Sequence, residues 1–390
     1  MRIVINGLAA KGEGGLTYLL NLLPELPAIA SDCKVVVYVN SKAGRTVHAR
    51  LNGRLDHVTI REVAVESRLR RLLWEETTLP KVLRDEQTDV LFVPSPALPG
   101  RCGCASVIAI RNMEAYCEGA LASLGPRERA HHHYRRWSTD RALRQANRVI
   151  LVSEATVPLL RQRHTWNLDR TVVVYHGRDR LFEPMARGPA CDLVRERFGV
   201  SKPFVLYISK TRPYKRHKEL VEAMAELSRR GRGELLVIAG ECQQPYYGEV
   251  SARIRTLGLT DRVHWLGDVE QRLLPALYNA AALLAFPSTC EACPNILIEA
   301  MACGLPILAS DIAVVREITA GAAMYRDATD PASLADGLEL LLLNPDLRSD
   351  YRSRALRRAE DFSWRRTAER TMEVLRQAAA DANRSQPLSC

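Results

Sequence analysis

Residues 287–311, in the second half of the chain, constrain the fold more than any other segment. The apolar stretch ALLAFPS runs into them as a strand, and PILAS near their end forms a second strand. Between the strands lie a loop and then a helical part from Ile296 to Cys303, which Gly304 and Pro306 end. This order predicts a βαβ unit with parallel strands. In such units a ligand usually binds at the loop after the first strand, next to the helix N-terminus.

The same segment carries two carboxylates, Glu291 in the loop and Glu299 in the helix. Taken alone, such a pair is more often a solvated loop residue and a surface helix residue. Glu299, however, stands inside the apolar run ILIEAMA, where burying an unpaired carboxylate is costly. Two vicinal hydroxyls of a ribose or another sugar would supply the donors that it needs. We therefore expect a nucleotide or sugar ligand here.

The spacing of these carboxylates resembles a known signature. Glutamate, seven residues, glutamate, and then Ala-Met-Ala-x-Gly-x-Pro before a strand that ends in serine is similar to the signature of the retaining GT-B glycosyltransferases. This large family includes bacterial lipopolysaccharide and exopolysaccharide glycosyltransferases and relatives of sucrose synthase. The resemblance covers most of the chain. It implies an α/β GT-B fold, in which two Rossmann-like domains with parallel sheets face each other across a cleft and a C-terminal helix crosses back to the first domain.

The resemblance to this family also implies how the chain divides into domains. With 390 residues the chain is long enough for two domains, each with its own core. We expect an acceptor-binding domain at residues 1–184, a nucleotide-sugar-binding domain at 185–360, a crossover helix at 361–381 that Ser363 caps, and a tail at 382–390.

A basic loop follows the strand FVLYIS in the second half, and it holds Lys210, Arg212, Lys215 and Arg216. Charge runs are usually solvated faces. This one lies at the carboxyl end of a strand and ahead of a helix start, where an anionic ligand should bind. The sequence therefore predicts an anion site at this loop.

The resemblance assigns roles to individual residues around this anion site. It implies that Lys210 and Lys215, with Arg212 in reserve, grip the donor diphosphate. Glu291 would contact the donor sugar and Glu299 the ribose. The remaining donor-binding positions implied by the family motif are Leu266 near the base and Asn295, Ile296 and Leu297 beside the phosphates.

Glycines follow the first strand of the chain at Gly12, Gly14 and Gly15, where the backbone must turn tightly or approach a ligand. A dinucleotide fingerprint would need another glycine at position 17, where Thr17 stands. A nicotinamide-dependent enzyme is therefore disfavoured. In the family a Gly-Gly pair at this place lets a loop approach the donor diphosphate and the acceptor, which implies that role for Gly14 and Gly15.

The strand SVIAI ends in Arg111 and Asn112. Many family members carry at this place a histidine followed by an acidic or amide residue, close to the transferred sugar. The departure suggests a cationic side chain that faces an acceptor or a phosphate. We therefore expect Arg111 and Asn112 to bind the acceptor.

The expected reaction moves a sugar, with retention, from a UDP- or GDP-type nucleotide sugar to a glycan or lipid-linked acceptor. Negative charge develops on the departing diphosphate, so fixed cations should dominate catalysis. The sequence contains no Asp-x-Asp motif for a divalent metal, and neither cysteine pair, 102/104 or 290/293, has a histidine at ligand spacing. We expect no metal and no cofactor. A sugar-nucleotide epimerase and a non-catalytic nucleotide-sugar-binding protein are the alternatives.

Charge is unevenly spread along the chain. Residues 1–185 hold 27 Lys and Arg against 19 Asp and Glu, whereas the remainder holds 28 against 26. No nucleic-acid-binding motif accompanies this excess, so an acidic membrane surface is the better partner. Its candidate contact is the stretch from Arg68 to Trp74, with Arg70 and Arg71 beside leucines, although an ordinary helix with a solvated basic face is an equal alternative.

The cellular setting is also an expectation at this point. No apolar run reaches the length of a membrane span, and the N-terminus lacks the pattern of a signal peptide. The ten cysteines are scattered, which predicts reduced thiols. We therefore expect a cytoplasmic protein with peripheral contact to the inner face of the plasma membrane.

Overall fold

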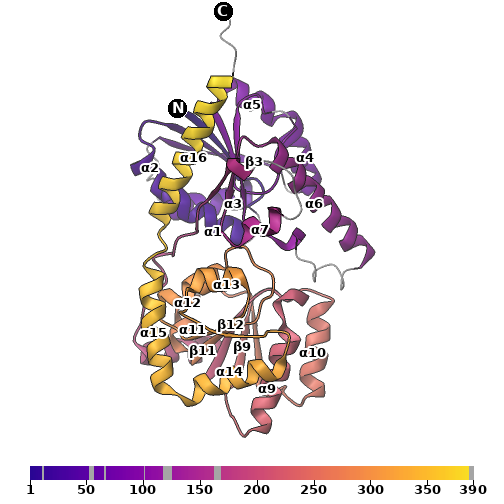
Figure 1. Ribbon diagram of the computed structural model, residues 1–390, viewed down its shortest axis with the longest axis vertical. Coiled ribbons are helices and arrows are strands. Elements are labelled where there is room, and N and C mark those ends of the chain that lie inside the picture. The colour runs from indigo at the N-terminus through magenta and orange to yellow at the C-terminus, as the bar shows by residue number, and fades with distance from the viewer. Residues whose placement is uncertain are drawn as a thin grey trace, which may run out of the picture. The chain divides into compact units, whose positions relative to one another are not determined.

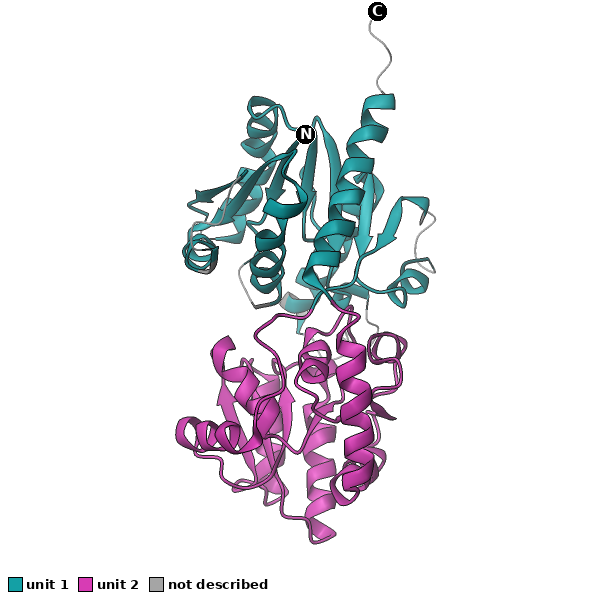
Figure 2. Cartoon of the chain, turned by 90° about the vertical axis from the view of Figure 1, so that its left-hand side faces the viewer, with its two compact units in different colours: residues 1–116, 125–177, 363–390 teal, residues 117–124, 178–362 magenta. Residues whose placement is uncertain are grey.

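A computed structural model describes residues 1–10, 13–51, 57–65, 67–100, 102–116, 125–161 and 168–385. The chain forms two compact units, which Figure 2 distinguishes by colour. Unit 1 combines Met1–Tyr116, Gly125–Gly177 and Ser363–Cys390, and most of unit 2 is Arg178–Phe362. Each unit contains one sheet of parallel strands covered by helices, as the expected α/β fold class requires.

The sheet of unit 1 has seven strands in the order β3-β2-β1-β4-β5-β6-β7. Their bounds are Arg2–Asn6 (β1), Lys34–Asn40 (β2), Val58–Val63 (β3), Val90–Val93 (β4), Ala105–Ile110 (β5), Arg148–Leu151 (β6) and Thr171–Val173 (β7). The central strands β4 and β5 are buried along their whole length. Such continuous apolar runs are typical of parallel strands that are covered on both faces.

The helices of unit 1 are Glu13–Leu22 (α1), Leu26–Ile29 (α2), Ser41–Leu51 (α3), Arg68–Thr77 (α4), Leu79–Asp85 (α5), Pro126–Gln145 (α6), Thr156–Arg161 (α7) and Trp364–Ser385 (α16). The helical stretch that begins at Arg68 is interrupted near Pro80, because α4 ends at Thr77 and Pro80 lies in the first turn of α5. The expectation that glycines form a loop after the first strand is corrected in part. Gly14 and Gly15 belong to the first turn of α1, and Gly12 lies outside the described residues.

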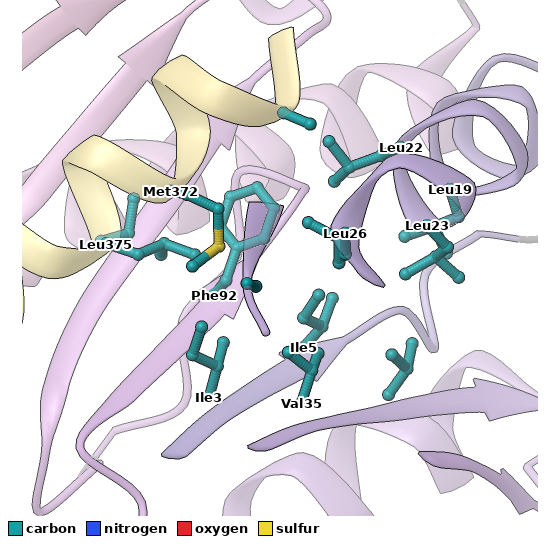
Figure 3. Close-up of a cluster of buried hydrophobic side chains, with 14 of the residues drawn as sticks. Ile3, Ile5, Leu19, Leu22, Leu23, Leu26, Val35, Phe92, Met372 and Leu375 are labelled. Atoms are coloured by element: carbon teal, nitrogen blue, oxygen red, sulfur yellow. The ribbon is translucent and has the colours of Figure 1, made fainter. Parts of the chain in front are cut away.

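The terminal helix α16 is part of the core of unit 1, although residues 178–362 separate it in the chain from the rest of that unit. Figure 3 shows Met372 and Leu375 among buried side chains of the sheet such as Ile3 and Phe92. The predicted cap is present, since the Arg366 amide donates to the Ser363 hydroxyl at 3.4 Å. The helix reaches Ser385, so residues 382–385 are helical rather than part of a tail, and 386–390 lie outside the described residues.

The chain leaves unit 1 at Gly177 and re-enters it at Ser363, and the two passages touch. A Cβ atom on Gly177 would lie 2.0 Å from the backbone nitrogen of Trp364. Only glycine permits such a close approach of two backbones. Steric contact with the backbone of Trp364 therefore requires glycine at position 177, where the chain leaves unit 1.

Unit 2 has six strands in the order β10-β9-β8-β11-β12-β13. Their bounds are Phe204–Ile208 (β8), Leu235–Ala239 (β9), Val263–Gly267 (β10), Leu283–Phe286 (β11), Ile307–Ser310 (β12) and Met324–Arg326 (β13). The helices are Arg187–Phe198 (α8), His217–Arg229 (α9), Tyr246–Thr256 (α10), Leu274–Ala280 (α11), Asn295–Ala302 (α12), Ala313–Thr319 (α13), Pro331–Leu343 (α14) and Pro345–Ala359 (α15).

The predicted βαβ unit at residues 287–311 is confirmed. β11 and β12 pair in parallel, with Ala285 opposite Leu308, and α12 connects them. The helix runs from Asn295 to Ala302, so it starts and ends one residue earlier than predicted. Gly304 stops it as predicted, because this glycine adopts a left-handed φ of 68°.

Candidate functional site

The strand order of unit 2 reverses between β8 and β11. From β8 the chain proceeds to β9 and β10 on one side and then returns to place β11 on the other side. In open α/β sheets ligands bind at the carboxyl ends of the strands on either side of such a switch point. The loop with the two lysines follows β8, and the loop with Glu291 follows β11. The topology therefore brings both predicted groups to the same place.

Hydrogen bonds tie these two loops together. The Tyr214 carbonyl accepts from the Thr289 amide at 2.9 Å and from the Thr289 hydroxyl at 3.1 Å. Buried Tyr207, on β8, donates its hydroxyl to the Lys215 carbonyl at 2.5 Å. The basic loop is thus held against the carboxylate loop by backbone contacts that do not depend on the charged side chains.

Lys215 and Glu291 form an ion pair at this junction. The Lys215 Nζ lies 2.5 Å from the Glu291 Oε1, and the two side chains are only 14% and 13% exposed. Charge-assisted hydrogen bonds of this kind are the strong ones, and partial burial protects the pair from screening by salt. Sequence reasoning assigned the two residues to different parts of one ligand, and the structure adds that they contact each other.

Lys210 has a different counter-ion, which the sequence reasoning missed. Its Nζ lies 3.0 Å from the Glu241 Oε2, and Gln243 Nε2 donates to the same oxygen at 2.7 Å. The hydrogen bond from Lys210 lowers the pKa of Glu241. The available signal was positional, because Glu241 comes two residues after the end of β9. Arg212, in the same basic loop, is half-buried.

Glu299 is held by a tyrosine from a neighbouring helix. The Tyr278 hydroxyl, on α11, donates to the Glu299 Oε2 at 2.8 Å. Burial and the nearby carboxylate raise the pKa of Tyr278 well above its usual value, so the phenol keeps its proton. The donor that Glu299 needs inside the apolar run ILIEAMA is therefore supplied in part by the protein, in addition to any ligand hydroxyl. No pattern in the sequence points to Tyr278, since it lies within a short buried helix.

The N-terminus of α12 follows the Glu291 loop directly. Pro294 precedes the helix and has no amide hydrogen. The Leu297 amide donates to the Pro294 carbonyl at 3.0 Å, so it is engaged within the first turn. Asn295 and Ile296, the first two residues of the helix, are half-buried rather than enclosed.

A buried histidine lies beneath the basic loop. His217 begins α9, and its ring stacks on Trp265 of β10 at 5.8 Å and lies 4.8 Å from the Tyr207 ring. Burial, together with the nearby Lys215 charge, lowers the pKa of His217 to about 3. The imidazole is therefore neutral and acts as a packing group. Leu266, the residue after Trp265, is half-buried near the end of the same strand.

In unit 1 Arg111 directly follows β5, and its side chain reaches the segments that follow β4 and β1, the two strands on either side of the switch point in that sheet. Its Nε donates to the Pro94 carbonyl, after β4, and its Nη1 donates to the Gly14 carbonyl in α1, both at 2.9 Å. The guanidinium also lies 4.5 Å from the ring of buried Tyr18. Burial lowers the pKa of Arg111. The structure thus shows Arg111 bonded to the protein backbone on two sides.

The other unit 1 candidates differ in their surroundings. Asn112 is exposed, and its Oδ1 accepts from the Glu114 amide at 2.7 Å, which closes a local turn. A Cβ atom on Gly15 would meet the Ala10 Cα at 3.2 Å, whereas one on Gly14 would meet nothing within 4 Å. Close packing therefore requires a glycine only at position 15.

One expectation about the cysteines is wrong. Cys290, beside Glu291, is disulfide-bonded rather than reduced, whereas Cys303 is a buried thiol whose pKa burial raises to about 12. Scattered spacing gives no sign of which cysteines tertiary contacts bring together. Among the described residues, no group of three His, Cys, Asp or Glu side chains is placed to hold a metal ion.

Known proteins resemble the chain in both sequence and structure. In sequence, the D-inositol 3-phosphate glycosyltransferase of Salinispora arenicola is 32% identical over 260 residues, which are 62% of this chain and 57% of that protein. The chain spans about half the length of such curated relatives. In structure, sucrose-phosphate synthase from Thermosynechococcus elongatus superposes with a TM-score of 0.78 at 18% identity, covering 98% of this chain and 100% of the other. The Anabaena protein HepE in complex with UDP-glucose gives 0.76 at 18% identity, covering 97% and 100%.

Two family models match consecutive halves of the sequence. The model for Glycosyltransferase Family 4 matches residues 12–180, and the model for Glycosyl transferases group 1 matches residues 194–358. The structural matches extend over nearly the whole chain and establish the fold. The comparisons confirm the GT-B part of the resemblance suggested by the spaced glutamates, and the chain belongs to the GT-B glycosyltransferases, with a Family 4 half followed by a group 1 half.

Proposed function

We propose that this chain is a retaining glycosyltransferase that transfers a sugar from a nucleoside diphosphate sugar to a glycan or lipid-linked acceptor. The observation that carries the proposal is the Lys215–Glu291 pair at the switch point of unit 2, with Lys210 on the same loop. Fixed cations at that point suit a leaving diphosphate, and a carboxylate beside them suits the hydroxyls of a donor sugar. Unit 2 is then the donor-binding part, and unit 1 binds the acceptor.

The nature of the donor is part of the proposal. The structural relative HepE was solved with UDP-glucose, which favours a UDP-type sugar over a GDP-type sugar for this chain. Glu299 would accept from the ribose hydroxyls, because a carboxylate can accept two hydrogen bonds at once. Asn295 and Ile296, at the start of α12, would place their amides beside a phosphate. The strand end at Leu266 would receive the base.

The reaction breaks the bond between the anomeric carbon and the β-phosphate oxygen, and it forms a bond from that carbon to an acceptor oxygen on the same face. The acceptor proton passes to the leaving phosphate, so no protein base is required. Lys215 and Lys210 would stabilise the charge that develops on the diphosphate. Losing one such donor costs roughly 100- to 1000-fold in rate. Since the sequence has no Asp-x-Asp motif and the lysines supply positive charge, we propose that turnover needs no divalent metal.

The test combines a donor panel with product analysis. The full chain would be incubated with UDP- and GDP-sugars and simple acceptors, with and without excess chelator. We expect one donor to be consumed equally in both conditions, and nuclear magnetic resonance of the product should show the anomeric configuration of the donor. An inverted product would overturn retention. Loss of turnover in chelator that magnesium or manganese restores would overturn metal independence, and tight donor binding without any transfer would indicate a binding protein.

A further inference from the structure

Two neighbouring helices of unit 1, α4 and α6, expose apolar side chains to solvent. Leu69 and Leu73 on α4 are 78% and 64% exposed, and Trp137 and Tyr134 on α6 are 54% and 38% exposed. These are four of the eight large apolar side chains that are exposed in the described part of the chain, so half of them are concentrated on these two helices. We call these four residues, together with Arg68 and Arg70, the α4–α6 face.

The α4–α6 face is continuous across the two helices, which run side by side in Figure 1. The Arg68 guanidinium on α4 lies 4.9 Å from the Tyr134 ring on α6, and its Nη1 is 2.5 Å from His131 Nδ1. The Tyr134 and Trp137 rings are 6.0 Å apart. Arginine and aromatic side chains thus alternate over one surface.

The charge of this region is strongly positive. The two helices contain nine arginines against four acidic residues. Three of the acids have partners within the protein: buried Glu75 accepts from Asn6 at 3.0 Å, exposed Glu76 lies 3.6 Å from Arg141, and half-buried Asp140 accepts from Tyr116 at 2.6 Å. The arginines of the two helices therefore outnumber the acidic residues of the same helices, and Arg135 has a carboxylate partner outside them, Glu114 at 2.9 Å.

The structure also sorts the basic stretch from Arg68 to Trp74 into outward and inward residues. Arg71 is 16% exposed and lies 3.7 Å from buried Glu75, and the Trp74 ring packs 5.5 Å from Tyr38. These two side chains belong to the protein interior. Arg68, Leu69, Arg70 and Leu73 remain on the outside.

We propose that the α4–α6 face binds the surface of a bilayer that contains anionic lipids. Leucines would enter the boundary between headgroups and acyl chains, tryptophan and tyrosine would lie at the headgroup level, and the arginines would meet lipid phosphates. None of the described helices is long and apolar enough to cross a membrane. This binding does not depend on the transferase activity.

A nucleic acid is the main competing anionic partner, and the leucines argue against it. Leu69 is the most exposed large apolar side chain in the described chain. Leucine neither stacks on a base nor donates a hydrogen bond to a phosphate. Its transfer from water to the acyl region of a bilayer, in contrast, lowers the free energy. A second copy of this chain would bring the same arginines together, which would repel each other.

The experiment is co-sedimentation of the full chain with vesicles of phosphatidylglycerol and phosphatidylcholine in equal parts, and with vesicles of phosphatidylcholine alone. One variant reverses charge, Arg68→Glu with Arg70→Glu. A second variant removes apolar surface, Leu69→Gln with Leu73→Gln. The matched control is Leu340→Gln with Leu343→Gln on α14 of unit 2, where the leucines are 41% and 55% exposed. Thermal unfolding of each variant reports whether the fold is kept.

We expect the anionic vesicles to bind the unchanged chain and the control variant, with binding weakened at high salt. Each arginine at an anionic surface strengthens binding about fivefold, and each glutamate is repelled, so the charge-reversal variant should bind at least about 25-fold more weakly at low salt. The apolar variant should also lose binding at both salt concentrations. Equal sedimentation of both variants with the control, or binding to pure phosphatidylcholine as strong as to the anionic vesicles, would overturn the proposal.

A spectroscopic readout distinguishes insertion from electrostatic adsorption. Trp137 fluorescence should shift to shorter wavelength on addition of the anionic vesicles, and the shift should be missing in Trp137→Phe. Size-exclusion chromatography tests whether a second copy of the chain covers the α4–α6 face instead. If the chain elutes as a dimer that Leu69→Gln with Leu73→Gln dissociates, a second copy covers the face and the bilayer proposal is wrong. Tighter binding to single-stranded DNA than to vesicles would overturn it in favour of a nucleic acid.

Discussion

The Lys215–Glu291 contact leads to a sharp prediction about Glu291→Gln. If the diphosphate meets Lys215, it competes with the Glu291 carboxylate for the same ammonium group, 2.5 Å away. Glutamine has the same shape, and its carbonyl oxygen can still accept a hydrogen bond, but it carries no charge. The variant therefore removes the competing charge without opening a cavity.

The size of the effect follows from the geometry. A hydrogen bond to a charged group is worth roughly 1.5–3 kcal/mol in a protein, and both partners here are about 14% exposed, so solvent screens the pair only in part. Because glutamine keeps part of the bond, we expect it to release about 1 kcal/mol. Binding of a free nucleoside diphosphate should therefore become about fivefold tighter in Glu291→Gln. Transfer should fall about 100-fold, because the donor sugar loses a charged partner.

Calorimetric titration with nucleoside diphosphate and steady-state rates with the nucleotide sugar measure the two effects. Lys215→Ala is the matched variant, and it should lower turnover about 100-fold with a smaller loss of diphosphate affinity. In the double variant, Glu291→Gln should no longer tighten binding, since the ammonium group is gone. If Glu291→Gln weakens diphosphate binding as much as Lys215→Ala does, the carboxylate orients the lysine instead of competing for it, and the reasoning fails.

Two further predictions concern Glu299 and Arg111. Glu299→Gln should weaken free nucleotide and nucleotide sugar alike by roughly 1.5–3 kcal/mol, because its proposed partner is the ribose that both share; calorimetry with both ligands checks this, and a loss confined to the nucleotide sugar would contradict it. Arg111→Lys should lower the free energy of unfolding by about 1.5 kcal/mol, since an ammonium group cannot keep both bonds that the guanidinium makes to Pro94 and Gly14. Urea unfolding measures this loss, and unchanged stability would show that the two bonds contribute nothing.

Much of the fold could be predicted from local sequence patterns. The apolar runs in β4, β5 and β11 are continuous, as buried parallel strands require. Gly304 and Pro80 mark a helix end and a helix break through their own backbone restrictions. Glu291 and Glu299 could be picked out because they lie in a strand, loop and helix pattern whose geometry is local. Each of these features depends on residues that are near each other in the chain.

The pairings of the charged groups depended on the tertiary structure. Lys215 meets Glu291 across 76 residues, Lys210 meets Glu241 across 31, and Tyr278 meets Glu299 across 21. A sequence shows that a carboxylate inside an apolar run needs donors, but many tyrosines and lysines could supply them. The order of strands around the switch point selects the partner, because it decides which loops emerge side by side.

The exposed surface of unit 1 illustrates the same limit. The sequence by itself determined that the stretch from Arg68 to Trp74 is basic, amphipathic and helical, since the spacing of leucines and arginines is a local property. Only the tertiary structure decided that Trp74 and Arg71 face inward, and that Tyr134 and Trp137 of α6 complete the outer surface. The physical reason is that helical periodicity fixes which side chains share a face, whereas the packing of neighbouring elements decides which face is covered.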